Sequence, residues 1–144
     1  MEHSRQEKFT IIADEIRRNP HIKNCRIRYF GRKHGMSISS LKRGFSEVHH
    51  LSFASFVRRA CMDKAKLLLK SGTWSIDDIA DEVGFSDKSG FIAAFKRVEN
   101  ITPGQFKSQF EDQQLGILMD NEKVKNVNIA TVFELLKDKK RFPL

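Results

Sequence analysis

The sequence lacks a long hydrophobic run and has only 2 cysteines among its 144 residues. No apolar segment approaches the roughly 18 residues that a membrane-spanning helix needs. The N-terminus, MEHSRQEKF, also lacks the apolar core of a signal peptide. We therefore expect a cytoplasmic protein. Hydrophobic residues make up 40% of the chain and charged residues 31%, which indicates a globular domain of modest size rather than a disordered tail.

Signatures of disulfides and metal sites are missing. Cys25 and Cys61 are far apart and stand among apolar residues, so we interpret both as buried free thiols. His49 and His50 are adjacent. On a helix they would point about 100° apart, and they could not chelate one ion from one face. The sequence predicts no metal and no cofactor.

Signatures of catalysis are missing as well. The chain has no nucleophile–base combination, no carboxylate pair suited to acid–base catalysis and no phosphate-binding glycine loop. The acidic residues at 77–78 and 81–82 are better interpreted as helix N-terminal and solvent-facing acids. We expect that the protein is not an enzyme.

Positive charge is abundant and unevenly distributed. The formal net charge is +8, and the isoelectric point is near 9.7. Residues 1–50 carry 11 Lys and Arg against 5 Asp and Glu, so three quarters of the excess lies in the first third of the chain. Such a balance favours a polyanionic partner.

The stretch from Ser75 to Lys107 has the pattern of short helices joined by tight turns. Apolar residues recur at helical spacing in three segments, each preceded by a capping residue. The predicted N-caps are Ser75, Ser86 and Thr102, and the predicted left-handed terminators are Gly84 and Asn100. Two short helices joined by a glycine-containing turn predict a helix-turn-helix, whose second helix can enter the DNA major groove.

The same pattern occurs earlier in the chain, so the sequence contains an internal repeat. An offset of 49 residues aligns Gly35 with Gly84 and Ser37 with Ser86, and an offset of 50 aligns Leu41, Phe45 and Phe56 with Phe91, Phe95 and Phe106. In the first copy Arg26 stands where Ser75 caps the second, and Asn24 is close enough to replace it as a cap. Gly31 replaces Ala80, which lowers helix propensity by about 1 kcal/mol.

The second copy resembles the signature of AraC/XylS-type transcriptional regulators. The resemblance is carried by Ile79-Ala80, Gly84-Phe85-Ser86, Phe91, Phe95-Lys96 and Thr102-Pro103. It implies an all-α DNA-binding domain in which a linker helix joins two helix-turn-helix units. In this chain the first helix-turn-helix is about residues 26–50, the linker helix about 53–71 and the second helix-turn-helix about 75–100. All three lie within a domain of residues 1–113. The chain is similar to small stand-alone members of the MarA/SoxS kind, and an excised part of a larger regulator is the alternative. Met1 favours a whole protein.

The first candidate recognition helix spans about residues 38–48. Leu41, Phe45 and Val48 form its apolar face. The opposite face and the cap supply the candidate DNA-binding residues Ser37, Ser39, Ser40, Lys42, Arg43 and Ser46. Arginine can bond guanine through two hydrogen bonds, and lysine can contact guanine or phosphate. The resemblance implies that Ser39, Lys42 and Arg43 occupy base-reading positions.

The second candidate recognition helix spans about residues 87–100 and is a weaker base reader. Its candidate DNA-binding residues are Ser86, Lys88, Ser89, Lys96 and Arg97. Many relatives have arginine at the position of Ala93 and a bulky residue at the position of Gly90. Neither Ala93 nor Gly90 can form the two hydrogen bonds to guanine that an arginine can form. We expect the first unit to perform most direct readout, and the second to add phosphate contacts.

The remaining segments are predicted helices. Residues 5–18 form an amphipathic helix, and residues 53–71 form a linker about 28 Å long at about 1.5 Å per residue. That length approaches one DNA turn of about 34 Å. A short helix runs from Pro103 to about residue 113. Residues 114–144 are a C-terminal extension with an amphipathic helix around 129–136 and a basic KDKKR segment.

These features favour a sequence-specific bacterial DNA-binding regulator. It would place two recognition helices in successive major grooves of an asymmetric site. The alternative is a co-regulator that binds RNA polymerase or another regulator and contacts DNA only weakly. Two readers within one chain allow a monomer to bind DNA, and the C-terminal extension leaves a dimer open.

Overall fold

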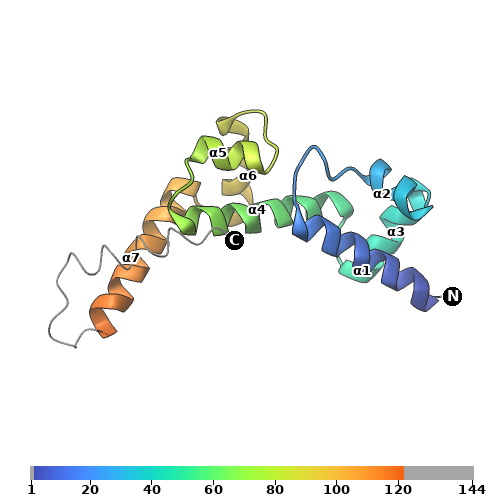
Figure 1. Ribbon diagram of the computed structural model, residues 1–144, viewed down its shortest axis with the longest axis horizontal. Helices are drawn as coiled ribbons and strands as arrows, with labels where there is room; N and C mark the ends of the chain where they lie inside the picture. The colour runs from blue at the N-terminus through green and yellow to red at the C-terminus, as the bar shows by residue number, and fades with distance from the viewer. Residues whose placement is uncertain (1, 122–144) are drawn as a thin grey trace. The chain divides into compact units, whose positions relative to one another are not determined.

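The computed structural model describes residues 2–121, with side chains from residue 5 to residue 118. This part of the chain is entirely helical apart from its loops, which confirms the predicted all-α class. The helices are α1 (Glu2–Arg18), α2 (Ile27–His34), α3 (Ile38–His49), α4 (Phe53–Ser71), α5 (Ile76–Glu82), α6 (Lys88–Glu99) and α7 (Pro103–Asn121) (Figure 1). Among them, no helix has both the length and the apolar character needed to cross a bilayer. The helix and basic segment predicted within 129–141 lie outside the described residues.

The chain divides into two compact units. The first comprises residues up to 64 together with 82–85, and the second comprises 65–81 and the described residues from 86 onward. Each unit contains one recognition-helix candidate, α3 in the first and α6 in the second.

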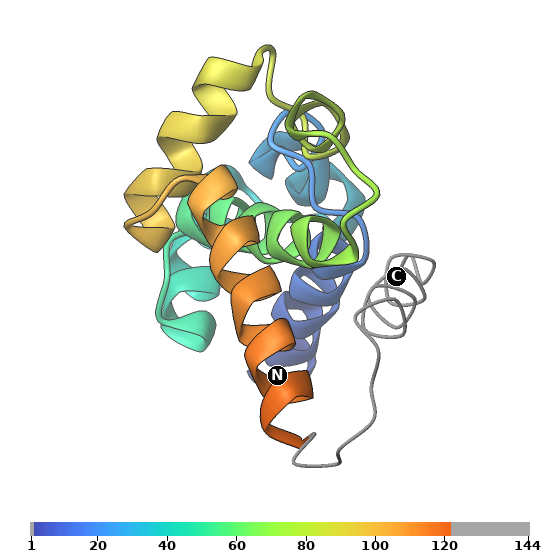
Figure 2. The ribbon, with the colours of Figure 1, turned by 90° about the vertical axis from the view of Figure 1, so that its left-hand side faces the viewer.

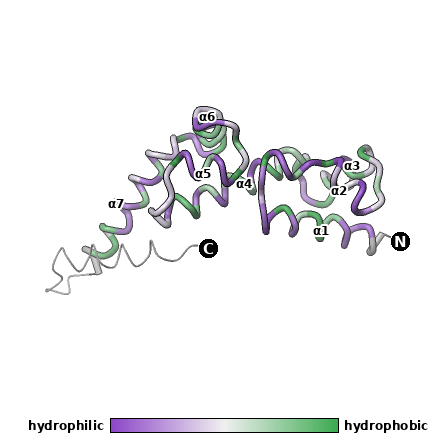
Figure 3. Tube along the Cα trace, turned by 45° about the horizontal axis from the view of Figure 1, so that its top comes forward, coloured by the Kyte–Doolittle hydropathy of each residue, from purple (hydrophilic) through white to green (hydrophobic). Residues whose placement is uncertain are grey.

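Phenylalanine rings dominate the core of the first unit. Phe45 lies 5.4 Å from Phe53 and 5.0 Å from Phe56 between ring centroids. From α1, four side chains at helical spacing join this core, namely Phe9, Ile12, Ala13 and Ile16. Green and purple alternate along α1 in Figure 3, as this amphipathic spacing requires. The predicted apolar face of the first helix is confirmed.

The second unit buries a smaller set of side chains. Phe95 packs against Phe91 at 5.9 Å and against Phe106 at 5.8 Å, where α6 leads into α7 (yellow to orange in Figure 2). The second half of α4 contributes Leu68 and Leu69, which are 4% and 1% exposed. Leu67 is 43% exposed, because the buried stripe of α4 passes through Leu68 and Leu69 instead.

Most predicted helix caps are present. The predicted caps Ser37 and Ser75 each accept a hydrogen bond from the backbone N–H three residues later, and Ser52 does the same at the start of α4. Thr102 and Gln105 form a reciprocal capping box, with Thr102 N donating to Gln105 Oε1 at 2.9 Å and Gln105 N donating to Thr102 Oγ1 at 3.1 Å. These hydrogen bonds satisfy helix N–H groups that would otherwise have no partner.

Two predicted caps and two helix ends are wrong. Arg26 is the N-cap of α2 and makes no side-chain capping bond, so Asn24 does not replace Ser75 as a cap. Asp87, not Ser86, caps α6 by accepting from Gly90 N at 2.7 Å. In addition α1 begins at Glu2, and α7 continues to Asn121 instead of ending near residue 113.

Glycine is required at two positions, Gly84 at a turn and Gly31 within α2, for two different reasons. Gly84 has φ +91°, and a Cβ there would lie 2.5 Å from the His21 ring. The neighbouring Ile22 N donates to Val83 O at 2.9 Å, so the loop before α2 packs directly on this turn. Gly31 is buried, and a Cβ there would lie 2.9 Å from the Met36 carbonyl oxygen. Close packing therefore accounts for Gly31, which the sequence alone marked only as a weak helix former.

Candidate nucleic-acid interface

The first helix-turn-helix consists of α2, a turn and α3. Gly35 takes the left-handed conformation at φ 66°, and its N–H and that of Met36 bond to carbonyls at the end of α2. Ser37 then caps α3 by accepting from Ser40 N at 3.2 Å. Leu41 and Phe45 are fully buried, so the opposite face of α3 is turned outward.

The six candidate residues of this helix and its cap are all exposed. They are Ser37, Ser39, Ser40, Lys42, Arg43 and Ser46. Lys42 and Arg43 form no ion pair within the described part of the chain. Their side chains therefore remain available to a ligand. Val48, predicted to be buried with Leu41 and Phe45, is half-buried at the end of the apolar face.

The second helix-turn-helix consists of α5, the turn at Gly84 and α6. Its candidate residues Ser86, Lys88, Ser89, Lys96 and Arg97 are also exposed. Phe91 and Phe95 are fully buried and fix the outward direction of α6. Ile92 is half-buried, whereas Lys42 at the corresponding position of α3 is exposed, so the outward face of α6 is narrower than that of α3. Its cap is the carboxylate of Asp87, whereas α3 has a neutral serine.

The two helix-turn-helix segments carry opposite charge. From 27 to 49 the chain has five Lys and Arg against one Glu, which gives +4 with histidines neutral. From 76 to 99 it has three Lys and Arg against six Asp and Glu, which gives −3. Since DNA is a dense polyanion, the first segment is electrostatically suited to its backbone and the second is not.

The sequence interpretation missed two exposed cations on α2. Arg28 and Arg32 stand one helical turn apart on the side of α2 opposite the buried Phe30. Their i, i+4 spacing across from Phe30 is the signal that identifies them. The first helix of such motifs crosses the DNA backbone, so these two side chains are candidate phosphate contacts.

A carboxylate on α1 anchors the other basic residues of α2. Glu15 accepts from Lys33 Nζ at 2.9 Å and lies 3.3 Å from His34 Nε2. Burial raises the pKa of Glu15, but the hydrogen bonds and charges of Lys33 and His34 outweigh it and leave the pKa below its usual value. These contacts hold the scaffold helix α2 against α1.

The cysteines take no part in this interface. Both are free, with Cys61 buried and Cys25 half-buried. Burial raises the pKa of the Cys61 thiol to about 12 and also raises that of Cys25. Both thiols are therefore protonated and poorly nucleophilic at neutral pH. Among the described residues no group of three or more His, Cys, Asp or Glu could hold a metal ion.

Comparison with known proteins places this geometry in a family. A model described as a helix-turn-helix domain matches residues 30–109, which is more than half of the chain. The HTH-type transcriptional activator RhaR of Mannheimia succiniciproducens is 28% identical over 81 residues, covering 56% of this chain and 29% of that protein. The HTH-type transcriptional regulator MtrA of Neisseria gonorrhoeae is 36% identical over 74 residues, covering 51% and 25%.

A solved structure shares the arrangement as well. The C-terminal domain of the two-component response regulator yesN from Fusobacterium nucleatum matches with a TM-score of 0.62 and 29% identity, covering 70% of this chain and 95% of that domain. The matched segment spans between a quarter and a third of the two curated relatives. With two helix-turn-helix segments in the described fold and a family model across both, the chain belongs to the AraC/XylS family of DNA-binding transcriptional regulators.

Proposed function

We propose that the protein regulates transcription by binding a specific, asymmetric DNA duplex, with α3 as the principal base reader. The observation that carries this proposal is the outward face of α3, where Lys42 and Arg43 are exposed and form no ion pair within the described residues. A side chain that is already paired would have to break that pair before it could bond a base.

Arg43 is the residue assigned to direct readout. Its guanidinium can donate two parallel hydrogen bonds to O6 and N7 of guanine, a contact worth about 1–3 kcal/mol of discrimination. Lys42 contacts guanine or phosphate. The serines at 39, 40 and 46 are short donors and acceptors beside these two residues. Arg28 and Arg32 on α2 add phosphate contacts that hold the helix in register but carry no sequence information.

The second helix-turn-helix has a supporting role in this proposal. Lys88, Ser89, Lys96 and Arg97 contact phosphates and some bases in the next major groove. The acidic α5 and the Asp87 cap limit the attraction of this segment for DNA. A site of two unequal halves follows, about 15–20 base pairs long, and it has no palindrome because one chain supplies both readers.

The proposal includes one partner other than DNA, which is RNA polymerase. A regulator that binds as a monomer can contact RNA polymerase beside its site, and activation is the direction that the name of RhaR suggests. A cytoplasmic location, next to the bacterial chromosome, stays a prediction.

Selection of bound duplexes from a random pool tests the proposal. The selected duplex and a scrambled control are then titrated at several salt concentrations. We expect a non-palindromic consensus and a preference of about 10³-fold or more over the control. Affinity should fall steeply with salt on both duplexes, because phosphate contacts release counterions.

The same experiment can reject the proposal. Equal, salt-dependent binding to both duplexes, with no consensus, would contradict sequence-specific reading. It would favour the alternative of a co-regulator that works mainly through a protein partner.

A further inference from the structure

Gly44 lies on α3 directly beside Arg43 and is buried. A Cβ built at Gly44 would lie 3.0 Å from Cε1 of Phe9 and nearer still to Cζ and Cε2 of the same ring. Real Cβ atoms essentially never approach so closely, so the ring occupies the space that any other residue at 44 would need. Phe9, from α1, is only 1% exposed. Its ring therefore packs on the backbone of the recognition helix itself.

Phe9 contacts α3 at a second point through its backbone. His49 Nε2 donates a hydrogen bond to the carbonyl oxygen of Phe9 at 3.1 Å. The same imidazole lies 4.5 Å from the Phe45 ring and 5.4 Å from the Phe56 ring, which fixes its orientation. One residue of α1 thus holds α3 both at Gly44 and at His49, more than one helical turn apart.

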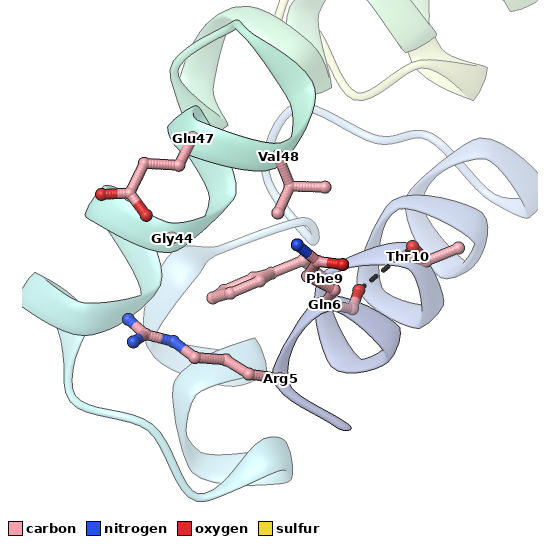
Figure 4. A pocket seen from close by; sticks show the side chains of 7 residues that line it. All are labelled: Arg5, Gln6, Phe9, Thr10, Gly44, Glu47 and Val48. Atoms are coloured by element: carbon pink, nitrogen blue, oxygen red, sulfur yellow. Dashed lines mark hydrogen bonds between the residues drawn. The ribbon is translucent and has the colours of Figure 1, made fainter. Parts of the chain in front are cut away.

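Figure 4 shows this junction from close by, with the Phe9 side chain directed from α1 toward α3. A groove between the two helices surrounds the contact. Its walls are Arg5, Gln6 and Thr10 from α1 and Glu47 and Val48 from α3, together with Phe9 and Gly44.

We propose that Phe9 and Gly44 form a positioning contact for base reading. The contact fixes where α3 lies against α1, and hence where the guanidinium of Arg43 reaches. This inference depends on the proposed role of Arg43. Two hydrogen bonds to one guanine tolerate only a few tenths of an ångström of error, since a hydrogen bond weakens outside about 2.7–3.2 Å. A displacement of the backbone at residue 44 is passed directly to residue 43.

The second helix-turn-helix has a different arrangement at the corresponding positions. With the 50-residue offset, Ala94 corresponds to Gly44, and it is half-buried and carries a Cβ. Glu99 corresponds to His49, and it pairs with Lys66 Nζ at 3.1 Å. The packing of a phenylalanine ring on a helix glycine is thus a feature of the first copy, which also contains Arg43.

Four variants test the inference. Gly44→Ala introduces the clash, and Phe9→Leu removes the far end of the ring. The double variant Phe9→Leu/Gly44→Ala exchanges bulk between the two positions. Leu68→Ala is the matched control, since it truncates a buried side chain of the second unit and lowers stability without touching α3. For each variant the affinity for the selected duplex is divided by that for a duplex whose α3 half-site is scrambled, and Tm is recorded.

We expect Gly44→Ala to lower this ratio about 5- to 150-fold, the range of a lost pair of hydrogen bonds to one base. Phe9→Leu alone should lower it less, and the double variant should recover most of the wild-type ratio. Leu68→Ala should lower Tm and leave the ratio unchanged. If Gly44→Ala does not fold, a ratio lowered in Phe9→Leu and recovered in the double variant supports the inference equally.

A contrary result has a clear form. If Gly44→Ala and Phe9→Leu lower Tm but keep the wild-type ratio, as the control does, the contact is only structural and the inference is wrong. Arg43→Ala, measured in parallel, separates this failure from that of the proposed function. A wild-type protein that does not distinguish the two duplexes would overturn both.

Discussion

The recognition helices of the two helix-turn-helix segments both bury an apolar face, whereas their outward faces differ in charge. Phe45 and Phe95 are both fully buried at corresponding positions of α3 and α6. The segment 27–49 around Phe45 has a net charge of +4, and the segment 76–99 around Phe95 has a net charge of −3. With the 50-residue offset, Arg43 of the first copy corresponds to Ala93 of the second. Copies of one fold can therefore keep the same core while only one keeps a surface suited to a polyanion, and the fold alone does not show which copy reads bases.

The turns of the two copies repeat this contrast on a smaller scale. Gly35 and Gly84 both take the left-handed conformation, as do His50 and Asn100 at the ends of the recognition helices. The backbone is thus conserved between the copies even where the residue type is not. The caps differ in charge, since Ser37 is neutral and Asp87 is a carboxylate.

The largest expected effect on DNA affinity comes from a substitution in α3, the proposed principal base-reading helix. Arg43→Ala should weaken binding to the selected duplex by about 1–3 kcal/mol and binding to random DNA only slightly, because a lost base contact matters where the base is present. Equilibrium titration of both duplexes measures this. Lys96→Ala in the second copy is the comparison, and it should weaken both duplexes alike and reduce the salt slope by up to about 1. An equal loss on both duplexes in Arg43→Ala would show that Arg43 contacts phosphate only.

A change in the free energy of unfolding is expected from a substitution in α2. Gly31→Ala should destabilise the protein by on the order of 1 kcal/mol, because overpacking against the Met36 carbonyl exceeds the gain in helix propensity. Urea denaturation measures the change. Gly116→Ala on α7 is the control, since a Cβ there would meet nothing within 4 Å and only the propensity gain remains. Stabilisation of both variants alike would refute the close-packing interpretation of Gly31.

Exchanging the helix caps should change affinity by a smaller amount. Asp87→Ser removes a negative charge at the start of α6 and keeps a capping oxygen, so binding should tighten about two- to fivefold at low salt. Ser37→Asp should weaken binding by a similar factor. Both changes should shrink as salt is raised, because the interaction is screened. Caps without influence on affinity would contradict the electrostatic difference between the copies.

The smallest effect concerns the ion pairs of Glu15. Its pKa in the folded protein is lowered, so the stability that it contributes is present above its unfolded pKa and is lost as pH falls through the folded value. Glu15→Gln should lower Tm at pH 7 and should match the wild type at pH 2. Asp14→Asn is the control, because the Asp14–Arg17 pair is exposed and contributes little. A Tm difference that persists at pH 2 would assign the effect to packing instead.

Much of the fold follows from the sequence because periodicity and capping residues are local signals. The stripe on α1 and the caps Ser37, Ser75 and Thr102 are found where the sequence predicts them. Asp87 was missed because serine and aspartate are adjacent there and both are good caps. The close packing at Gly31 could not be predicted, because propensity carries no information on which backbone approaches a glycine.

The candidate site was predictable to a similar extent. Exposure of Lys42 and Arg43 follows from their place opposite Leu41 and Phe45 on one helix. The packing of Phe9 on Gly44 joins residues 35 positions apart, and no local pattern predicts it. Sequence therefore indicates which face of a helix meets a ligand, whereas tertiary contacts determine where that face is held.

The base information in the selected duplexes, position by position, tests the central claim most directly. We expect two unequal halves, with most of the information in one half, and a selection repeated with Arg43→Ala should lose the consensus in that half alone. Two halves of equal information, or a strong half unaffected by Arg43→Ala, would contradict the claim that α3 is the principal reader.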